Sequence, residues 1–288
     1  MGSGRMAQAA DLHLHSAMSD GTEQPAEMVA SAFASGVRTL ALTDHDTTDG
    51  WSAAAEAARE RGMTFLPGVE LSTRIPGRSI HLLAYLLDPT HEGLNVEMDR
   101  VRDDRVGRAE RIVGNLSRDY DLGWEDVLEQ TSDGATIGRP HIADALVSRG
   151  IVPSRDAAFA GILHPRAGYY VGHYATDVFE AIRLVLDAGG VPIVAHAMTE
   201  GRSGQMPEAT LYDLADAGVA GFEVDHRENP PAGREVLRCV VADRGLIATG
   251  SSDYHGTGKP NRPGENTTPL AEVERIIALG TGSAPVFP

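Results

Sequence analysis

The sequence predicts an α/β protein, a βα barrel that carries a small inserted helical subdomain. Short apolar runs alternate with amphipathic stretches from residue 11 to about 90 and again from residue 176, which is the pattern of βα units. Candidate metal-ligating side chains repeatedly follow the predicted strands, and in a barrel the carboxyl ends of the strands meet on one face. The 288 residues suffice for one barrel with an insertion.

The first part of the chain supplies the opening βα units. In an extended segment over 11–15, the period of two places His13 and His15 on one side and the intervening leucines in the core. A helix capped by Thr22 and stopped by Gly36 follows, with Met28, Val29, Ala32 and Phe33 on its buried face. Further predicted elements are a strand over 39–42, an alanine-rich helix over 51–61, extended segments over 64–66 and 69–72, and a strand over 80–85.

The alternation then breaks, and residues 94–165 are charged and helical with no clear strand. Gly138-Arg139-Pro140 opens one of these helices, and another is expected over 156–163. We therefore expect a barrel domain over 11–93 and 166–288, a helical insertion over 94–165, and a tag remnant or loose terminus over 1–10. Later elements are a helix over 176–188, a strand over 191–195, a helix around 211–217, and strands over 221–224 and 246–249.

Composition narrows the functional classes. The formal net charge of −16 argues against binding long nucleic acid, because it offers no excess of cations to neutralise phosphates. The single cysteine, Cys239, excludes an internal disulfide and is expected to be a buried small side chain in a helix. No apolar run is long enough for a membrane helix, so we expect a cytoplasmic protein with no membrane partner and no obligate protein partner.

Histidine and carboxylate clusters follow the apolar runs and predict a metal centre. Imidazole and carboxylate donors without thiolate suit Mn, Fe or Zn better than Ca or Mg. Each residue alone has a plainer interpretation as a buried hydrogen-bonded side chain, but the series is hard to explain that way. The candidate ligands are His13, His15, Asp20, His45, Glu70, His81, His196, Asp253 and His255. The remaining histidines, His91, His164, His173 and His226, are expected at the surface or in loops.

These motifs resemble the PHP family, the polymerase and histidinol phosphatase domains, over the span from Asp11 to His255. The resemblance implies a distorted seven-stranded βα barrel with two or three divalent ions, manganese first, with Fe, Zn or Mg as alternatives. It also implies three ligand groups: His13, His15, Glu70 and Asp253; then Glu70 with His81 and His196; then Asp20, His45 and His255.

The resemblance is strongest to stand-alone phosphoesterases similar to nucleoside 3′,5′-bisphosphate phosphatases, whose Gly-Arg-Pro-His segment recurs at residues 138–141. Clustered ions polarise phosphoryl oxygens and make a bound hydroxide available as nucleophile. The expected activity is hydrolysis of a small phosphomonoester, with the 3′-phosphate of a nucleoside bisphosphate as the first choice. Alternatives are a histidinol-phosphate phosphatase, a 5′-3′ exonuclease on short RNA or DNA, and a silent metal-binding module.

Several residues are candidates for catalysis and substrate contact. Asp20 and His255 are expected to act as catalytic ligands. Arg139 could hold a phosphate bidentately or form a helix-start salt bridge, and His141 beside it could bond the substrate or protonate the leaving oxygen. Arg166 and Lys259 are weaker substrate-binding candidates. Asp11, Asp44 and Asp46 flank the ligands and are expected to orient imidazoles, with cap or turn duty as the alternative for Asp46.

Overall fold

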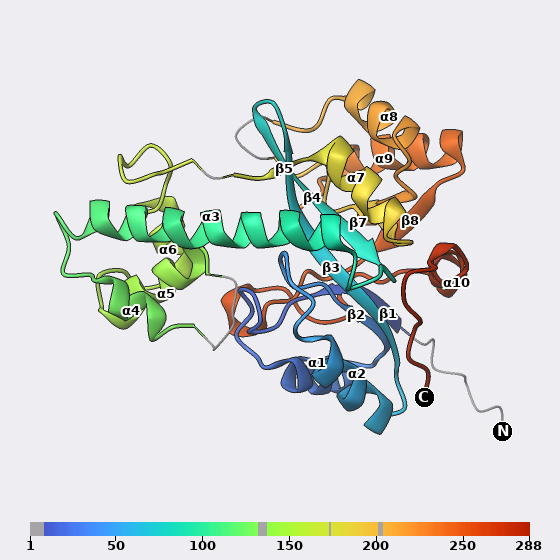
Figure 1. The fold of residues 1–288 in the computed structure, drawn as a ribbon, viewed down its shortest axis with the longest axis horizontal. Coiled ribbons are helices and arrows are strands. Elements are labelled where there is room, and N and C mark those ends of the chain that lie inside the picture. Colours follow the sequence, from blue (N-terminus) through green and yellow to red (C-terminus); the bar gives the residue numbers. More distant parts are fainter. Residues whose placement is uncertain (1–8, 132–136, 173, 201–203) are drawn as a thin grey trace.

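The computed structural model describes residues 9–131, 137–172, 174–200 and 204–288, and the predicted loose terminus falls almost entirely outside this range. The chain forms a mixed α/β fold around an eight-stranded sheet (Figure 1). The two-residue strand β5 (Thr176–Asp177) pairs with β3 beside the main path. That path runs, in spatial order, through β1 (Ala9–Leu14), β2 (Val37–Leu42), β3 (Thr64–Ile75), β4 (Arg78–Tyr85), β6 (Val191–Val194), β7 (Gly221–Asp225) and β8 (Ile247–Gly250).

One strand breaks the parallel arrangement that the alternation predicts. β4 runs antiparallel to both β3 and β6, whereas the other neighbours on the path are parallel. The reason is the connection: β3 and β4 are joined by Pro76 and Gly77 alone, with Gly77 at φ +79°, and two residues allow a hairpin but no crossover. The amino-terminal half of β4, including His81, therefore lies at the same end of the sheet as the carboxyl ends of its parallel neighbours.

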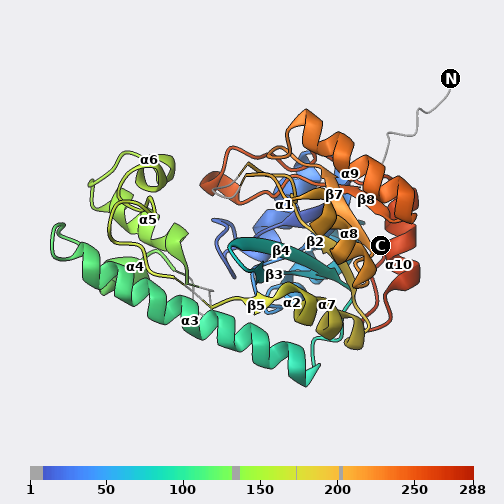
Figure 2. The same cartoon turned by 90° about the horizontal axis from the view of Figure 1, so that it is seen from above.

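Helices flank the sheet on its outer sides (Figures 1 and 2). α1 begins after Gln24, whose backbone N–H donates to Glu27, so the predicted cap at Thr22 is wrong. The Thr22 hydroxyl instead lies 3.2 Å from that of Thr257. Phe33, predicted on the buried face, is 36% exposed. These helices are α1 (Pro25–Ala34), α2 (Trp51–Glu60), α7 (Val178–Asp187), α8 (Glu208–Asp216), α9 (Pro231–Arg244) and α10 (Leu270–Leu279).

The last two helices differ most from expectation. Cys239 lies in α9, as predicted, but it is exposed rather than buried. The buried side of α9 carries Gly233, Leu237 and Val240, and Cys239 falls off that stripe because successive residues turn by about 100°. α10 occupies a segment for which the sequence predicts no element.

The segment predicted as a helical insertion holds most of α3 (Glu92–Leu116), and all of α4 (Trp124–Leu128), α5 (Arg139–Ser148) and α6 (Arg155–Ala160). α3 runs alongside the sheet and out to α4–α6, which lie apart from the strands (Figure 2). These helices bury an apolar cluster of their own around Ile112, Leu116, Ile142 and Leu146. None of the helices in the described ranges is long and apolar enough to cross a membrane.

Candidate metal centre

The nine predicted ligands converge around Glu70, in the middle of β3. His13 lies on β1 and His81 on β4, while the others follow strand ends or sit in the loop after β1. Two of them, His196 and Asp253, have positive φ (28° and 55°), as does Asp46 next to His45 (54°). Positive φ is costly for residues other than glycine, so strained backbone positions concentrate at this cluster.

A first group of four donors comes from His13, His15, Glu70 and Asp253. The two Nε2 atoms lie 3.1 Å apart, each 3.0–3.2 Å from Oε2 of Glu70 and 3.4 Å from Oδ1 of Asp253. Bonds of about 2.1 Å to one ion would place neighbouring donors about 3.0 Å apart in octahedral and about 3.4 Å apart in tetrahedral geometry. The observed separations fall in this range, so the four donors fit one ion.

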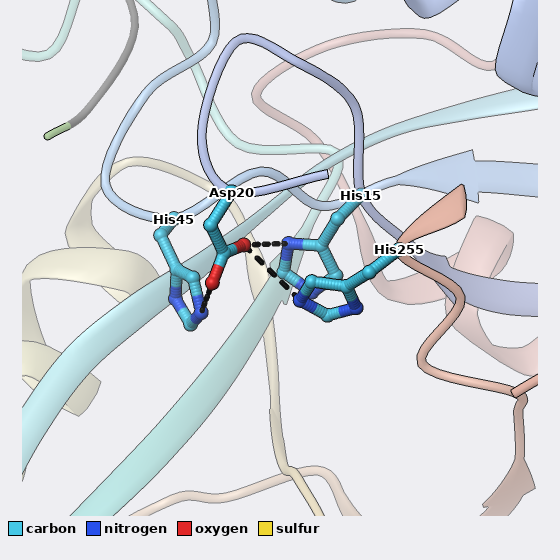
Figure 3. A group of neighbouring side chains, drawn as sticks. All are labelled: His15, Asp20, His45 and His255. Atoms are coloured by element: carbon cyan, nitrogen blue, oxygen red, sulfur yellow. Dashed lines mark ion pairs between the residues drawn. The ribbon is translucent and has the colours of Figure 1, made fainter. Parts of the chain in front are cut away.

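A second group gathers His15, Asp20, His45 and His255 (Figure 3). The Asp20 carboxylate reaches His255 Nε2 at 3.1 Å, His15 Nδ1 at 3.7 Å and His45 Nε2 at 3.9 Å. Both Oδ1 of Asp20 and Nε2 of His255 are buried without a hydrogen-bond partner in the described structure. Buried polar atoms left unpaired in this way are costly, and a cation bound between them would satisfy both.

A third group surrounds the same Glu70 carboxylate. His81 Nδ1 lies 2.8 Å and His196 Nε2 3.4 Å from Oε1, and His45 Nδ1 lies 3.4 Å from Oε2. The resemblance groups Glu70 with His81 and His196, and the geometry adds His45, which together with Glu70 and His81 also forms a set of ligand size. Glu70 is thus a member of the first and third groups, and its carboxylate also contacts His15 and His45 of the second group.

The charges of the centre suit cations. Burial favours the neutral carboxyl, but His45 and His13 outweigh it and hold the pKa of Glu70 well below its ordinary value. Burial also favours the neutral carboxyl of Asp253. Nearby cationic groups, of which Lys259 is the strongest, outweigh it and keep the pKa of Asp253 well below its ordinary value. These carboxylates are therefore ionised at neutral pH and offer negative charge to divalent ions.

The three flanking aspartates do not orient imidazoles directly, contrary to the prediction. Asp11 accepts hydrogen bonds from the backbone N–H groups of Ser252 (3.0 Å) and Gly264 (2.8 Å). Asp46 accepts from Ser72 and pairs with Arg105. Asp11 thus joins two loops to β1, and Asp46 joins the loop after β2 to β3 and α3.

Asp44 acts one step further from the imidazoles. It accepts from Ser16 and from the hydroxyl of Ser19 at 2.6 Å, and that hydroxyl lies 3.4 Å from His15 Nδ1. Burial raises the pKa of Asp44 to about 6 against these hydrogen bonds and the nearby histidine. Asp44 therefore supports His15 through Ser19.

Two further residues belong to the centre and were missed from sequence. Glu223 on β7 is fully buried, with Oε1 3.0 Å from His13 Nδ1 and Oε2 accepting the backbone N–H of His196 at 2.9 Å. His226, expected at the surface or in a loop, lies in the loop after β7 but is fully buried, with its ring 5.1 Å from that of His196. A carboxylate inside an apolar strand and a histidine just after it were the signals, the same ones that marked the nine ligands.

The predicted substrate-binding residues lie in different surroundings. Arg139 donates to the carbonyl of Leu163 and lies over the rings of Phe159 and Tyr170. Arg166 is exposed in the loop after α6. Lys259 contacts the centre itself, with Nζ 2.7 Å from Oδ2 of Asp253.

Of the histidines predicted to lie at the surface or in loops, His173 lies outside the described residues, and His91 caps α3.

Two adjoining open clefts, of about 390 and 450 Å³, separate the insertion from the loops of the sheet domain. His141 lines the first, Lys259 lines the second, and Arg155 lines both. Arg155 pairs with Asp144 and also donates to the backbone carbonyl of Asp20 at 3.4 Å. The clefts therefore reach the loop that carries a predicted ligand.

Comparison with known proteins agrees with this geometry. The family model for the PHP domain matches residues 11–131. The chain is 31% identical to a 3′,5′-nucleoside bisphosphate phosphatase of Chromobacterium violaceum, over 93% of this chain and 94% of that protein. It is 32% identical to a 5′-3′ exoribonuclease of Haemophilus influenzae, over 87% and 91% of the two chains. A solved structure assigned as a metal-dependent phosphoesterase, from Bifidobacterium adolescentis, superposes with a TM-score of 0.93 at 41% identity, over 96% and 97% of the chains.

The fold and the donor cluster thus define a metal-dependent phosphoesterase. The chain belongs to the PHP family, as its sequence motifs predicted.

Proposed function

We propose that the enzyme removes the 3′-phosphate from a nucleoside 3′,5′-bisphosphate. The observation that carries this proposal is the pair of adjoining clefts beside the donor cluster, lined by Arg155 and Lys259. Their volumes are those of small-molecule sites, which run from about 300 to 1,000 Å³. A mononucleotide would place one phosphate at the cluster and extend its remainder along the clefts. The similarity to a bisphosphate phosphatase supports the same choice.

We propose that two or three divalent ions, manganese first, are held by the nine ligands in the three groups described. When bound, such ions polarise phosphoryl oxygens and lower the pKa of water towards neutrality. The protein supplies the arrangement: Glu70 spans the groups, Asp20 and His255 close the outer one, and Glu223 fixes His13. Sequence and geometry together support this assignment, which elemental analysis of the purified protein would test.

His141 fits the role of a hydrogen-bond donor to the substrate better than that of an acid. Burial lowers the pKa of His141, so the ring is neutral at pH 7. The backbone N–H of Gly138 donates to Nδ1 at 3.1 Å, so the proton of the neutral ring is on Nε2. This N–H is available to a phosphate oxygen in the cleft that His141 lines.

For the cationic contacts we propose Arg155 and Lys259 ahead of Arg139 and Arg166. Arg155 lies close to the segment that follows β8: a Cβ at Gly258 would lie 2.2 Å from Nη1 of Arg155. The absence of a side chain there lets the guanidinium lie between the two clefts. Lys259 keeps 36% of its side chain exposed while it bonds Asp253, so its ammonium can meet an incoming anion.

We also propose that the sheet closes into the distorted seven-stranded barrel implied by the resemblance. Its end strands approach at an isolated parallel bridge between Leu14 and Tyr254, where the N–H of His15 donates to the Tyr254 carbonyl at 2.9 Å. With this closure, residues 94–165 form the insertion, and the barrel comprises the segments on either side of it.

A second candidate is a 5′-3′ exonuclease acting on short RNA or DNA. The 32% identity to an exoribonuclease favours it, and an oligonucleotide end could occupy the same clefts. The net charge of −16 disfavours long nucleic acid but leaves short ends possible.

The discriminating experiment is phosphate release from three substrates by the Mn-loaded protein: a nucleoside 3′,5′-bisphosphate, histidinol phosphate and a short 5′-phosphorylated oligonucleotide, with chelator-treated protein as control. We expect the highest kcat/KM for the bisphosphate. Absence of release from the bisphosphate would contradict the proposal, and mononucleotide release from the oligonucleotide would favour the exonuclease. Metal-dependent turnover of none of the three would indicate a silent module.

A further inference from the structure

His226 is a seventh histidine at the centre, beside the six among the predicted ligands, and none of the three ligand groups includes it. It follows β7 and is fully buried. Its ring lies 5.1 Å from that of His196 and 6.4 Å from that of His13, centroid to centroid. It therefore borders two of the ligand groups from the β7 side.

The contact on one side of the ring fixes where its proton lies. The backbone N–H of Glu228 donates to Nδ1 of His226 at 3.2 Å. A backbone N–H is always a donor, so Nδ1 carries a lone pair and the neutral ring has its proton on Nε2. An Nε2 atom that bears a proton has no lone pair for an ion. His226 is therefore a hydrogen-bond donor towards the centre.

That donor lacks a partner in the described structure. Nε2 of His226 is buried without a hydrogen bond, and Oδ2 of Asp253 lies 3.8 Å away, beyond hydrogen-bond distance. The same oxygen already accepts from Lys259 at 2.7 Å. A buried N–H without an acceptor is costly unless the site gains one during function.

We propose that His226 is a catalytic residue whose Nε2–H donates a hydrogen bond to a phosphoryl oxygen of the substrate, and of the phosphate product, held at the centre. A phosphoryl group is the acceptor that a phosphoesterase brings to this position, and a donor to a charged oxygen is stronger than one between neutral groups. The inference rests on phosphoesterase activity alone, whatever the leaving group.

Two substitutions distinguish the hydrogen-bond donor at Nε2 of His226 from the acceptor at Nδ1 that the N–H of Glu228 contacts. In His226→Asn the side-chain oxygen lies near the place of Nδ1 and accepts from Glu228, but no donor reaches the position of Nε2. In His226→Gln the amide nitrogen approaches that position. His164→Asn is the matched control, because the N–H of Arg166 donates to His164 Nδ1 at the same 3.2 Å in the helical insertion.

The measurement is binding of inorganic phosphate to each Mn-loaded variant by calorimetry, together with kcat/KM, metal content and Tm. We expect His226→Asn to weaken phosphate binding and lower kcat/KM by about 10- to 100-fold, with metal content and Tm near wild type. His226→Gln should recover part of the loss, and His164→Asn should behave as wild type.

Phosphate affinity within twofold of wild type in His226→Asn would overturn the proposal. Loss of an ion from that variant would also overturn it, because the ring would then be holding metal. If phosphate binding falls as expected but the wild-type enzyme does not hydrolyse nucleoside bisphosphate, the substrate proposal alone has failed.

Discussion

Glu223 and His13 form a fully buried carboxylate–imidazole pair, with Oε1 of Glu223 3.0 Å from Nδ1 of His13. Burial disfavours the charged imidazole, but Glu70, Glu223 and Asp253 outweigh it and raise the pKa of His13 well above its ordinary value. The other Glu223 oxygen accepts the N–H of His196, whose backbone is strained at φ 28°. One carboxylate thus orients ligands of two groups, as supporting acceptors in metal sites commonly do.

Glu223→Gln should therefore weaken metal binding by about 10- to 100-fold. A glutamine has a single acceptor oxygen and cannot serve both His13 Nδ1–H and the His196 N–H. Activity titrated against Mn concentration, with metal content after dialysis, measures the effect. Glu235→Gln on the exposed side of α9 is the control, and equal metal retention by the two variants would contradict the assignment.

Asp20→Asn should lower kcat on the order of 100-fold while the fold persists, because Asp20 lies in a loop and its carboxylate faces His15, His45 and His255. The variant should lose about one equivalent of metal and keep the ions held through Glu70. Circular dichroism and elemental analysis check both points. Asp49→Asn, in the exposed turn before α2, should retain full activity, and a fully active Asp20→Asn would refute the ligand assignment.

Metal-free protein should lose stability as pH rises from about 7.5 to 9. Burial opposes charge on His15, but Asp253 and Glu70 raise its pKa to about 9, and the pKa of His196 is also raised against burial by Glu70. For such groups the folded state binds the extra proton, so their stabilisation is complete below about pH 6.5 and is lost through pH 9, at on the order of 1 kcal/mol per pH unit.

His45 and His255, whose pKa values burial lowers, add no opposing slope in that window, because they are neutral in both states above about pH 7.5. Metal loading should remove the loss, since ligand histidines bind ions as neutral rings. Tm measured with chelator and with Mn between pH 7.5 and 9 tests this. A Tm of the metal-free protein that stays constant or rises over the window would disprove it.

Arg155→Ala should raise KM for the nucleotide substrate about tenfold or more, with little change in metal content, because Arg155 lines both clefts. Arg139→Ala should change KM less and Tm more, since its guanidinium packs on Phe159 and bonds Leu163. Steady-state kinetics and thermal unfolding of the pair decide between them. A larger KM effect in Arg139→Ala would restore that residue as the phosphate contact predicted from sequence.

The sequence by itself determined the α/β class, most strands and helices and the chemical type of the centre. It could do so because these are local signals: apolar runs with a fixed period, and a histidine or carboxylate where each run ends, as at His13, His45 and Asp253. Glu223 and His226 carried the same signal more weakly.

The tertiary structure decided what depends on pairing between distant segments. The two-residue link after β3 reversed β4 and brought His81 to Glu70. Packing, rather than sequence neighbourhood, turned Asp44 towards two serines and Arg139 towards Leu163. It also brought Arg155 of the insertion next to the Asp20 loop. Such contacts join residues far apart in the chain, and no local period encodes which of several charged side chains will face the centre.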